Sequence, residues 1–485
     1  MIGGQFDIGV YLCELKDEDV IMTENEMKQI NQPAVENKMG VMPAGRLLIS
    51  MSVPMMMSML VQALYNIVDS IFVARVSEDA LTAVSLAFPV QPLMVALAGG
   101  TGVGVNALLS RSLGEKDYKR ANEAACNGIF LAVISYLVFL LVGIFVVKPF
   151  YYAQTSDPEI IMHGVEYLTI VCCLSMGFFA QFIFERLLQS TGKTFYAMIT
   201  QMTGAVINLI LDPIMIFGLF GFPRMEAAGA ALATVIGQIA AGVLGCIFNI
   251  KKNEEVHINL KGFRPSRQII GSIYKVGVPS IIMQSIGSIM TFSMNQILIA
   301  FSSTATAVFG VYFKLQSFIF MPVFGLNNGM VPIIAYNYGA RKKERMMKTY
   351  KLSLVFAVSI MALGTLIFLL IPDKLFMMFD ASEHMLSMGV PALRIICVHF
   401  PVAAFCIVTG SLFQALGNAV YSMINSICRQ LVVLLPAAYL LAQLGNVNFV
   451  WMAFPIAEVA SAILTTLFLI KMKRQVIDKL GSERA

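Results

Sequence analysis

The sequence predicts an all-α polytopic membrane protein of twelve transmembrane helices, arranged as two six-helix lobes that are related by a parallel internal repeat. Three observations support this fold class. Of the 485 residues, 58% are hydrophobic and only 13% are charged, and the mean hydropathy is +0.76, whereas soluble domains carry about 25% charged residues. Apolar segments long enough to span a bilayer follow one another along the chain. The two halves of the chain also align at one fixed offset.

Each predicted span is an apolar segment of about 20 residues or more, the length that crosses the hydrocarbon core of a bilayer. The spans cover residues 47–73, 81–110, 122–147, 160–184, 194–219, 227–249, 269–300, 305–336, 350–371, 385–412, 419–443 and 449–472. The predicted domains are a polar cytoplasmic tail (1–44), an N-lobe (45–249), a cytoplasmic linker (250–268), a C-lobe (269–473) and a second cytoplasmic tail (474–485). The first tail lacks the features of a signal peptide. It is expected to be disordered or to begin before the true start, for which Met22 is a candidate.

Basic residues gather in alternate breaks between the spans. Four lie between Arg111 and Arg120, five between Lys251 and Arg267, and five between Arg341 and Lys348, whereas the other breaks hold isolated bases. Because cytoplasmic loops carry the excess of Lys and Arg, both termini are predicted to be cytoplasmic. The net charge of +5 reflects this bias, and no nucleic-acid partner is expected.

An offset of 225 residues superposes the two halves without a gap. The paired positions are Pro54 with Pro279, Gly114 with Gly339, Gln189 with Gln414, Gly192 with Gly417, Tyr196 with Tyr421, and Met198 with Met423. Each half holds six predicted spans, an even number, so both halves enter the membrane from the same side. The repeat is therefore parallel, and transporters often place their substrate cavity at such a repeat interface.

A carboxyl group lies in the middle of the predicted span 194–219. Asn208 and Asp212 are one helical turn apart and share a face. Pro213 cannot donate to the carbonyl of Leu209, so a kink is expected there. A carboxyl group at the centre of a bilayer costs roughly 3 kcal/mol or more unless it is paired or used. Asp212 is thus either a functional site or a structural carboxylate that neighbouring helices satisfy.

A second acidic residue, Asp69, lies in the first predicted span on one face with Gln62 and Asn66. Its counterpart in the second half is Met294, and Ala437 is the counterpart of Asp212, so the acidic groups belong to one lobe. This asymmetry favours a dedicated cation site. A buried aspartate can exchange protons near neutral pH, and oxygens of Asp69, Asn208 and Asp212 could instead hold Na⁺; the sequence leaves both ions open.

The second lobe contains embedded basic residues in place of acidic ones. Lys314 is interpreted either as a paired group or as a cavity residue, and Arg394 lies on the tenth span. Arg429 is expected to extend to the membrane interface, with Glu458 as a possible partner. Among 32 methionines, Met283, Met290 and Met294 share one predicted span. They either line a pocket for varied apolar ligands or fill the core.

No motif of an enzyme or of an ATP-driven pump is present in the sequence. Glycines 99, 100 and 102 follow no strand and precede no Lys-Ser/Thr pair, so they do not form a phosphate-binding loop. The eight cysteines are not spaced with the four histidines, which indicates neither a disulfide framework nor a zinc site. We therefore expect no catalytic residue, no cofactor and no metal site apart from the possible Na⁺ site.

Several motifs recur along residues 47–473. They are Pro54, Val-Asp-Ser-Ile-Phe-Val-Ala-Arg at 68–75, Ser-Arg-Ser-Leu-Gly-Glu-Lys at 110–116, Leu-Gln-Ser-Thr-Gly-Lys at 188–193, Asn208-x-x-x-Asp212-Pro213, Gly-Ala-Ala-Leu-Ala-Thr at 229–234, Tyr336-Asn337-Tyr338-Gly339 and Phe413-Gln414-Ala415-Leu416-Gly417. Together these motifs resemble the multidrug and toxic compound extrusion (MATE) family, in particular its bacterial MepA-like and DinF-like branch.

The resemblance implies a multi-pass exporter in the bacterial cytoplasmic membrane that exchanges amphipathic, often cationic compounds for H⁺ or Na⁺, with bending of helices at Pro54 and Pro213. The family's cation site is carried over onto Asp69, Asn208, Asp212 and Thr234. The expected substrate cavity comprises Gln62, Tyr65, Asn66, Met283, Met290, Met294, Asn295 and Lys314. A monomer is expected. The alternatives are a lipid-linked oligosaccharide flippase or other solute exporter of the same superfamily, and a passive channel.

Overall fold

The computed structural model describes residues 37–74, 78–87, 89–259, 262–379 and 381–482. All regular elements in this part of the chain are helices, which confirms the all-α prediction. Eleven of these helices are long and apolar enough to cross a membrane, and α8 (Pro158–Cys173) with α9 (Met176–Ser190), bent by 43°, gives a twelfth if the pair forms one span. Most of the predicted first tail, residues 1–36, lies outside the described residues.

The other helices of the first half are those up to the linker. They are α2 (Lys38–Val41), α3 (Ala44–Ala74), α4 (Glu78–Leu86), α5 (Val90–Gly114), α6 (Tyr118–Phe145), α7 (Val147–Tyr152), α10 (Thr194–Phe217), η1 (Leu219–Gly221) and α11 (Glu226–Lys252). The predicted second span is divided into α4 and α5 at Pro89, which has no N–H for the helical ladder. By contrast, α3 continues through Pro54, and α10 continues through Pro213.

The second half repeats this pattern. Its helices are α12 (Arg267–Ile299), α13 (Ser303–Gly339), α14 (Lys343–Leu370), α15 (Pro372–Met377), α16 (Glu383–Ile396), η2 (Cys397–His399), α17 (Phe400–Ala415), α18 (Ala419–Ile427), η3 (Cys428–Leu434), α19 (Leu435–Ala442), α20 (Val447–Trp451), α21 (Ala453–Met472), η4 (Lys473–Ile477) and α22 (Lys479–Ser482). The predicted second tail therefore begins as helix, because η4 and α22 continue from α21.

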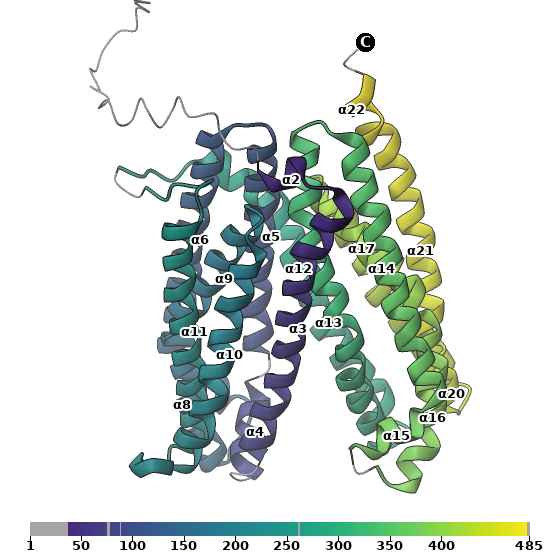
Figure 1. Ribbon diagram of the computed structural model, residues 1–485. Helices are drawn as coiled ribbons and strands as arrows, with labels where there is room; N and C mark the ends of the chain where they lie inside the picture. The colour runs from purple at the N-terminus through teal and green to yellow at the C-terminus, as the bar shows by residue number, and fades with distance from the viewer. Residues whose placement is uncertain (1–36, 75–77, 88, 260–261, 380, 483–485) are drawn as a thin grey trace, which may run out of the picture. The chain divides into compact units, whose positions relative to one another are not determined.

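The two halves meet along four helices. Within residues 37–482, α5 packs along α12, and α3 packs along α13. At the offset of 225, these two contacts are counterparts of each other. Figure 1 shows helices up to α11 on one side and α13 to α22 on the other, with the two groups diverging towards the end that carries α4 and α15. Buried apolar side chains of both halves, such as Val105 of α5 and Ile273 of α12, belong to one core cluster.

At the opposite end, two glycines bring α5 and α13 into direct backbone contact. A Cβ atom on Gly114 would overlap the carbonyl group of Tyr336, and a Cβ atom on Gly339 would overlap the carbonyl oxygen of Arg111. Gly114 and Gly339 are paired by the repeat, and so are Arg111 and Tyr336. The absence of a side chain at both positions allows the close approach of the two helices. The contact of Gly114 with Tyr336 and the contact of Gly339 with Arg111 are therefore equivalent under the repeat.

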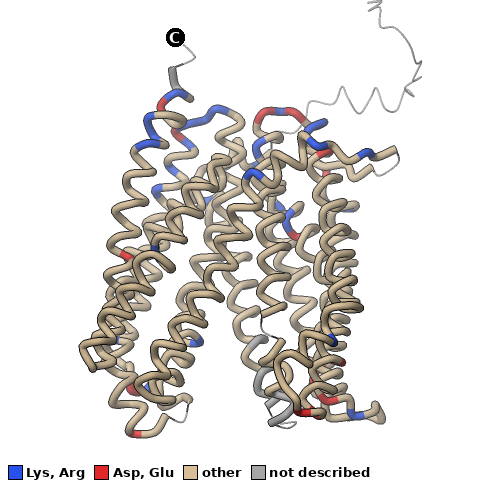
Figure 2. The backbone as a smooth tube through the Cα atoms, turned by 180° about the vertical axis from the view of Figure 1, so that it is seen from behind, with Lys and Arg blue, Asp and Glu red and all other residues tan. Residues whose placement is uncertain are grey.

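The short helix α2 lies across the same end and contacts both halves. The Nδ2 of Asn37 donates to the carbonyl of Thr191 in the first half, at 3.0 Å. In the second half, Arg345 Nη2 donates to the carbonyls of Met39 (3.1 Å) and Met42 (2.7 Å). Figure 2 shows that Lys and Arg gather at this end of the helices, where α22 also lies, and that few occur at the other end.

Candidate functional site

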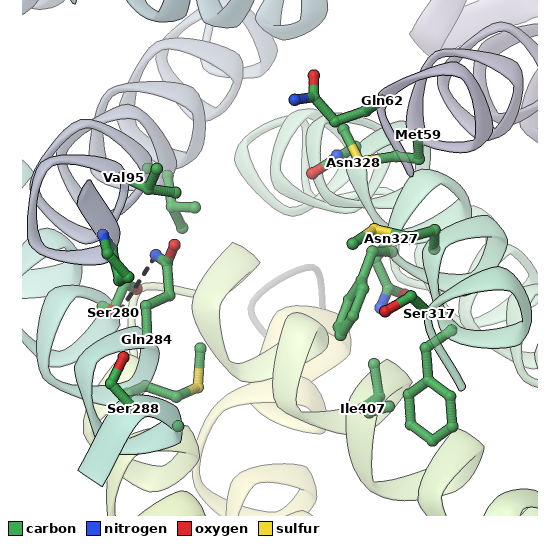
Figure 3. A pocket seen from close by; sticks show the side chains of 18 of the residues that line it. Met59, Gln62, Val95, Ser280, Gln284, Ser288, Ser317, Asn327, Asn328 and Ile407 are labelled. Atoms are coloured by element: carbon green, nitrogen blue, oxygen red, sulfur yellow. Dashed lines mark hydrogen bonds between the residues drawn. The ribbon is translucent and has the colours of Figure 1, made fainter. Parts of the chain in front are cut away.

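A cavity of about 1240 Å³ is lined by residues of both halves. Figure 3 shows part of its wall: Met59 and Gln62 extend from α3, Val95 from α5, and Ser280, Gln284 and Ser288 from α12, while Ser317, Asn327 and Asn328 come from α13 and Ile407 from α17. Since α3, α5, α12 and α13 are the helices by which the halves meet, a change in their packing changes the cavity directly.

Eight amide side chains among the described residues line the first-half wall of the cavity. Gln201 Nε2 of α10 donates to Gln62 Oε1 of α3, at 3.0 Å. On α9, Gln181 Nε2 donates to Glu185 Oε1, at 2.9 Å. The other lining amides of this half are Gln91, Asn106, Gln189, Asn208 and Gln238. Amides can both donate and accept, so this wall can adapt its hydrogen bonds to different polar groups.

The second-half wall contains a cluster of aromatic side chains. Phe309, Tyr312 and Phe454 form a cluster in which the ring centroids of Phe309 and Phe454 are 6.0 Å apart, and those of Tyr312 and Phe454 are 5.9 Å apart. His399 stacks on Phe454 at 6.2 Å with an interplanar angle of 20°. All four side chains line the cavity. Their faces offer large, rigid contact area to an apolar or cationic ligand.

Asp212 of α10 is fully buried, and it is connected to the cavity through Asn208, one turn away on the same helix. Asn208 Nδ2 donates to Asp212 Oδ1 (3.2 Å) and to Thr234 Oγ1 (3.1 Å). Asn208 and Thr234 both line the cavity. The close approach of the two helices at Gly237, whose Cβ would contact Asn208 Cβ at 3.4 Å, places these three side chains together. Their oxygens are of the kind that H⁺ or a hard cation binds.

Three of the four residues predicted to form the cation site lie together in the structure; the fourth is Asp69. Asn208, Asp212 and Thr234 come together, although Thr234 is 22 residues from Asp212 and on another helix. The backbone of Asp69 belongs to α3, but its side chain and that of Asn66 lie outside the described residues. The predicted pairing of Asp69 with Asp212 therefore stays a prediction.

Of the predicted cavity residues, Gln62, Tyr65, Met283, Met290 and Asn295 line the cavity. Met294 and Lys314 do not. Met294 is fully buried against its neighbours, because it is one position from Asn295 and therefore about 100° around α12. The Lys314 ammonium lies 5.9 Å from the ring centre of Phe379, so its side chain extends outward while Phe313 and Ser317 of the same helix line the cavity.

Two charged residues of the first half line the cavity but were not identified from the sequence. Glu185 and Arg186 lie on α9, beyond residue 184, where the sequence placed the end of that span. Arg186 Nη1 donates to Gln189 Oε1 (2.8 Å) and, across the two halves, to Asn328 Oδ1 (3.1 Å). The charges themselves ended the apolar segment in the sequence, although the helix continues to Ser190.

Arg429 does not extend to the membrane interface as predicted. Its Nη1 lies 3.2 Å from Glu458 Oε2, and both residues line the cavity. The suggested partnership with Glu458 is thus present. Arg394, by contrast, is exposed on α16 and is absent from the cavity lining. No group of three or more His, Cys, Asp or Glu side chains within the described residues could hold a metal ion.

Comparisons with known proteins agree with this architecture. The MatE family model matches residues 54–214 and 279–440, once in each half. The chain is 26% identical over 430 residues to the multidrug export protein MepA of Staphylococcus haemolyticus, covering 88% of this chain and 94% of that protein. A solved structure described as the outward-facing conformation of a multidrug resistance MATE family transporter of the MOP superfamily has a TM-score of 0.86 and 26% identity, covering 93% of this chain and 99% of its own.

A MOP superfamily transporter from Pyrococcus furiosus, whose structure is described as having a binding pocket of reverse polarity that suggests a different function, is also similar. Its TM-score is 0.83 at 25% identity, with 93% of this chain and all of that chain covered. The two matches of the family model begin 225 residues apart, at Pro54 and Pro279, which is the offset found in the sequence. Because the matches cover more than half of the chain, this protein belongs to the MatE family of membrane transporters.

Proposed function

We propose that this protein is a secondary active multidrug exporter that exchanges amphipathic organic cations for H⁺ or Na⁺ by alternating access. One observation carries the proposal: a cavity shared by both halves lies one hydrogen bond from a buried carboxyl group, through Asn208 to Asp212. An aspartate in the interior of a membrane protein is costly to maintain and typically marks an ion pathway. The relatives named MepA are multidrug export proteins, which favours drug-like cargo.

The proposed cycle couples the two sites through the packing of the halves. With the basic end in the cytoplasm, the halves diverge towards the outside, and the cavity is outward-facing. A cation then binds to Asp212 and Asn208, with Asp69 as a further predicted ligand, and α3 bends near Pro54 as cargo leaves. The protein turns inward, releases the cation and binds new cargo.

The available driving force is sufficient for drug export. One charge that moves through 100 mV yields about 2.3 kcal/mol, and one pH unit adds roughly 1.4 kcal/mol. One-for-one exchange of H⁺ for an uncharged compound is electrogenic and could therefore hold a substrate gradient of several hundred-fold, since each tenfold step costs about 1.4 kcal/mol. One-for-one exchange for a monovalent organic cation moves no net charge, so only the ion gradient drives it, at about tenfold per pH unit.

The test is ethidium export from proteoliposomes in which a pH gradient or a Na⁺ gradient is imposed separately. We expect one of the two gradients to drive export by the unaltered protein and to have no effect on Asp212→Asn. Asp117→Asn is the matched control, because Asp117 caps α6 outside the cavity and asparagine is an equally good cap. Undiminished gradient-driven export by Asp212→Asn would contradict the coupling role.

A lipid-linked oligosaccharide flippase is the second candidate, and one observation favours it: Arg186 and Arg429 line the cavity and could hold a pyrophosphate group. The charged lining residues, however, also include Glu185 and Glu458, so basic and acidic groups balance. This balance makes an anionic cargo less favourable than a cationic one. Reconstituted protein that moves a lipid-linked oligosaccharide across the bilayer and leaves ethidium in place would establish the flippase.

A further inference from the structure

The ion pair of Arg429 and Glu458 is an unusual feature of the cavity wall. Glu458 is 3% exposed, whereas the side chain of Arg429 is 27% exposed. One carboxylate oxygen of Glu458, Oε2, faces the guanidinium at 3.2 Å. The other, Oε1, is buried without a hydrogen-bond partner among the described residues; the nearby thiol of Cys406 is only a weak donor. The carboxylate therefore has capacity for one more positively charged or N–H donating group.

Neighbouring polar side chains are already occupied by one another. Asn425 Nδ2 donates to Ser461 Oγ at 3.0 Å, and Gln430 Nε2 donates to Ser426 Oγ at 2.9 Å. These residues cannot turn to Glu458 Oε1 without losing their own hydrogen bonds. A buried carboxylate oxygen left in this state costs free energy, so a ligand that satisfies it gains affinity.

The internal repeat shows that the ion pair has no charged counterpart in the first half. At the offset of 225, Arg429 corresponds to Gly204 on α10, and Glu458 corresponds to Ala233 on α11. Thus η3 and α21 of the second half carry an ion pair on the helices that correspond to α10 and α11, which carry the Asn208, Asp212 and Thr234 cluster. Arg429 also lies in a π-helical turn, Cys428–Leu434. Such turns inside α-helices are rare and frequently occur at functional sites.

An aromatic surface adjoins the carboxylate. Phe454 precedes Glu458 by one turn of α21, and the ring of Tyr312 lies 5.9 Å from that of Phe454. Both rings line the cavity. An organic cation whose rings contact Phe454 and Tyr312 would have its charged group within reach of Glu458. The guanidinium of Arg429 is planar, permanently charged and weakly hydrated, so it resembles the charged part of such a ligand.

We propose that Glu458 is the binding group for the positive charge of aromatic organic cations, and that Arg429 occupies this position until the cargo displaces it. The inference rests on the proposed export of organic cations and assigns its cargo site to the second half of the protein. Displacement moves Arg429 into the wider part of the cavity, where its side chain is already partly exposed. Compounds with no positive charge cannot displace it and gain nothing from Glu458.

The experiment measures equilibrium binding of tetraphenylphosphonium and tetraphenylborate to purified full-length protein in detergent. The two probes have nearly the same shape and opposite permanent charges, so pH changes neither. For Glu458→Gln we expect tetraphenylphosphonium to bind at least tenfold more weakly and tetraphenylborate to bind more tightly, because Arg429 is then free. For Arg429→Gln we expect the reverse: tighter binding of tetraphenylphosphonium and weaker binding of tetraphenylborate.

Arg429→Gln/Glu458→Gln serves as a second test, because two neutral side chains need no ion pair and the variant does not depend on the folding of either single variant. It is expected to lose the preference for the cation over the anion. Equal changes for both probes in the variants, or no change in any of them, would show that the pair has a structural role and would overturn the inference. If the unaltered protein binds neither probe and exports no ethidium, the proposed function itself fails, which is a different outcome.

Discussion

The two halves of the protein share one backbone plan and differ in how they hold charge. In the first half, the fully buried carboxyl group of Asp212 lies behind Asn208 of the same helix. In the second half, the corresponding helices hold a carboxylate in an ion pair on the cavity wall itself. A buried group next to the cavity suits a small ion, and a group on the wall suits a larger ligand. If both of our proposals hold, the internal repeat divides coupling and cargo recognition between its two copies.

Neutral substitutions of the charged residues in each half should separate ion coupling from cargo binding most clearly. We expect Asp212→Asn to lower gradient-driven ethidium export by about 100-fold or more, to the level without a gradient, because a neutral amide can neither take up a proton nor neutralise a bound cation. Its binding of tetraphenylphosphonium should change by less than about threefold. Arg429→Gln/Glu458→Gln should show the opposite pattern, with export that still responds to the gradient. Loss of both properties in both variants would remove the division of roles.

Alanine substitutions at Gly114 and Gly339 test whether the two halves contribute equally to stability at their contact. Gly114→Ala and Gly339→Ala each place a Cβ atom against a backbone carbonyl group of the other half, and no side-chain rotation relieves this overlap. Each should lower the free energy of unfolding by about 1–3 kcal/mol, by similar amounts, as followed through the fluorescence of the single tryptophan, Trp451. Gly271→Ala is the control, because nothing lies within 4 Å of its added Cβ. Unequal losses of unfolding free energy would show that the two halves share a backbone arrangement but not the energetics of this contact.

Substitution of Asn208 or Thr234, the neutral side chains of the first-half cluster, should have smaller effects on export. Asn208→Ala removes two hydrogen bonds, and Thr234→Val removes one. At about 0.6–1.7 kcal/mol for each hydrogen bond inside a membrane protein, the coupling-ion concentration that half-activates export should rise by about tenfold and about threefold, respectively. A larger effect of Thr234→Val than of Asn208→Ala would place the ion on Thr234 instead.

The smallest effect is expected at α2, which contacts both halves outside the membrane spans. Burial lowers the pKa of Lys38, and Glu255 partly opposes this effect. Because the folded pKa is below the unfolded one, stability rises as the pH increases from the folded value towards the ordinary value of 10.5. Lys38→Met should therefore raise the melting temperature slightly near pH 7, and this gain should vanish above pH 10.5. Lys348→Met, at an exposed position of α14, should show no such pH dependence.

Much of the architecture was predictable because hydropathy and repetition are properties of long segments. The spans, the offset of 225 residues and the helical turn that links Asn208 to Asp212 needed only periodicity. The break between α4 and α5 at Pro89 was expected from the local effect of proline, whereas α5 continues through Pro92, where a break was also expected. The sequence contains prolines that break a helix and others, such as Pro54 and Pro213, that do not, and tertiary packing decides between them.

The side of a helix that faces the cavity was harder to predict. Met294 and Asn295 are adjacent, and only one lines the cavity; Lys314 extends outward while its neighbour Phe313 faces inward. One residue rotates a side chain by about 100°, and apolar periodicity is weak in a helix surrounded by lipid on one side and apolar neighbours on the other. Glu185 and Arg186 were missed for the related reason that charge ends an apolar segment before the helix ends.

The contact between Gly114 and Gly339 has a consequence for how easily the basic end could open. At these two residues the helices touch through their backbones and bury no side-chain hydrocarbon, so parting this contact would expose few apolar atoms to water. Hydrophobic free energy scales with apolar area, at about 25 cal/mol per Å², and the glycine contact itself would accordingly add little to the cost of opening. That cost would come instead from the apolar side chains around it, such as Leu113 and Ile333, which belong to the shared core cluster.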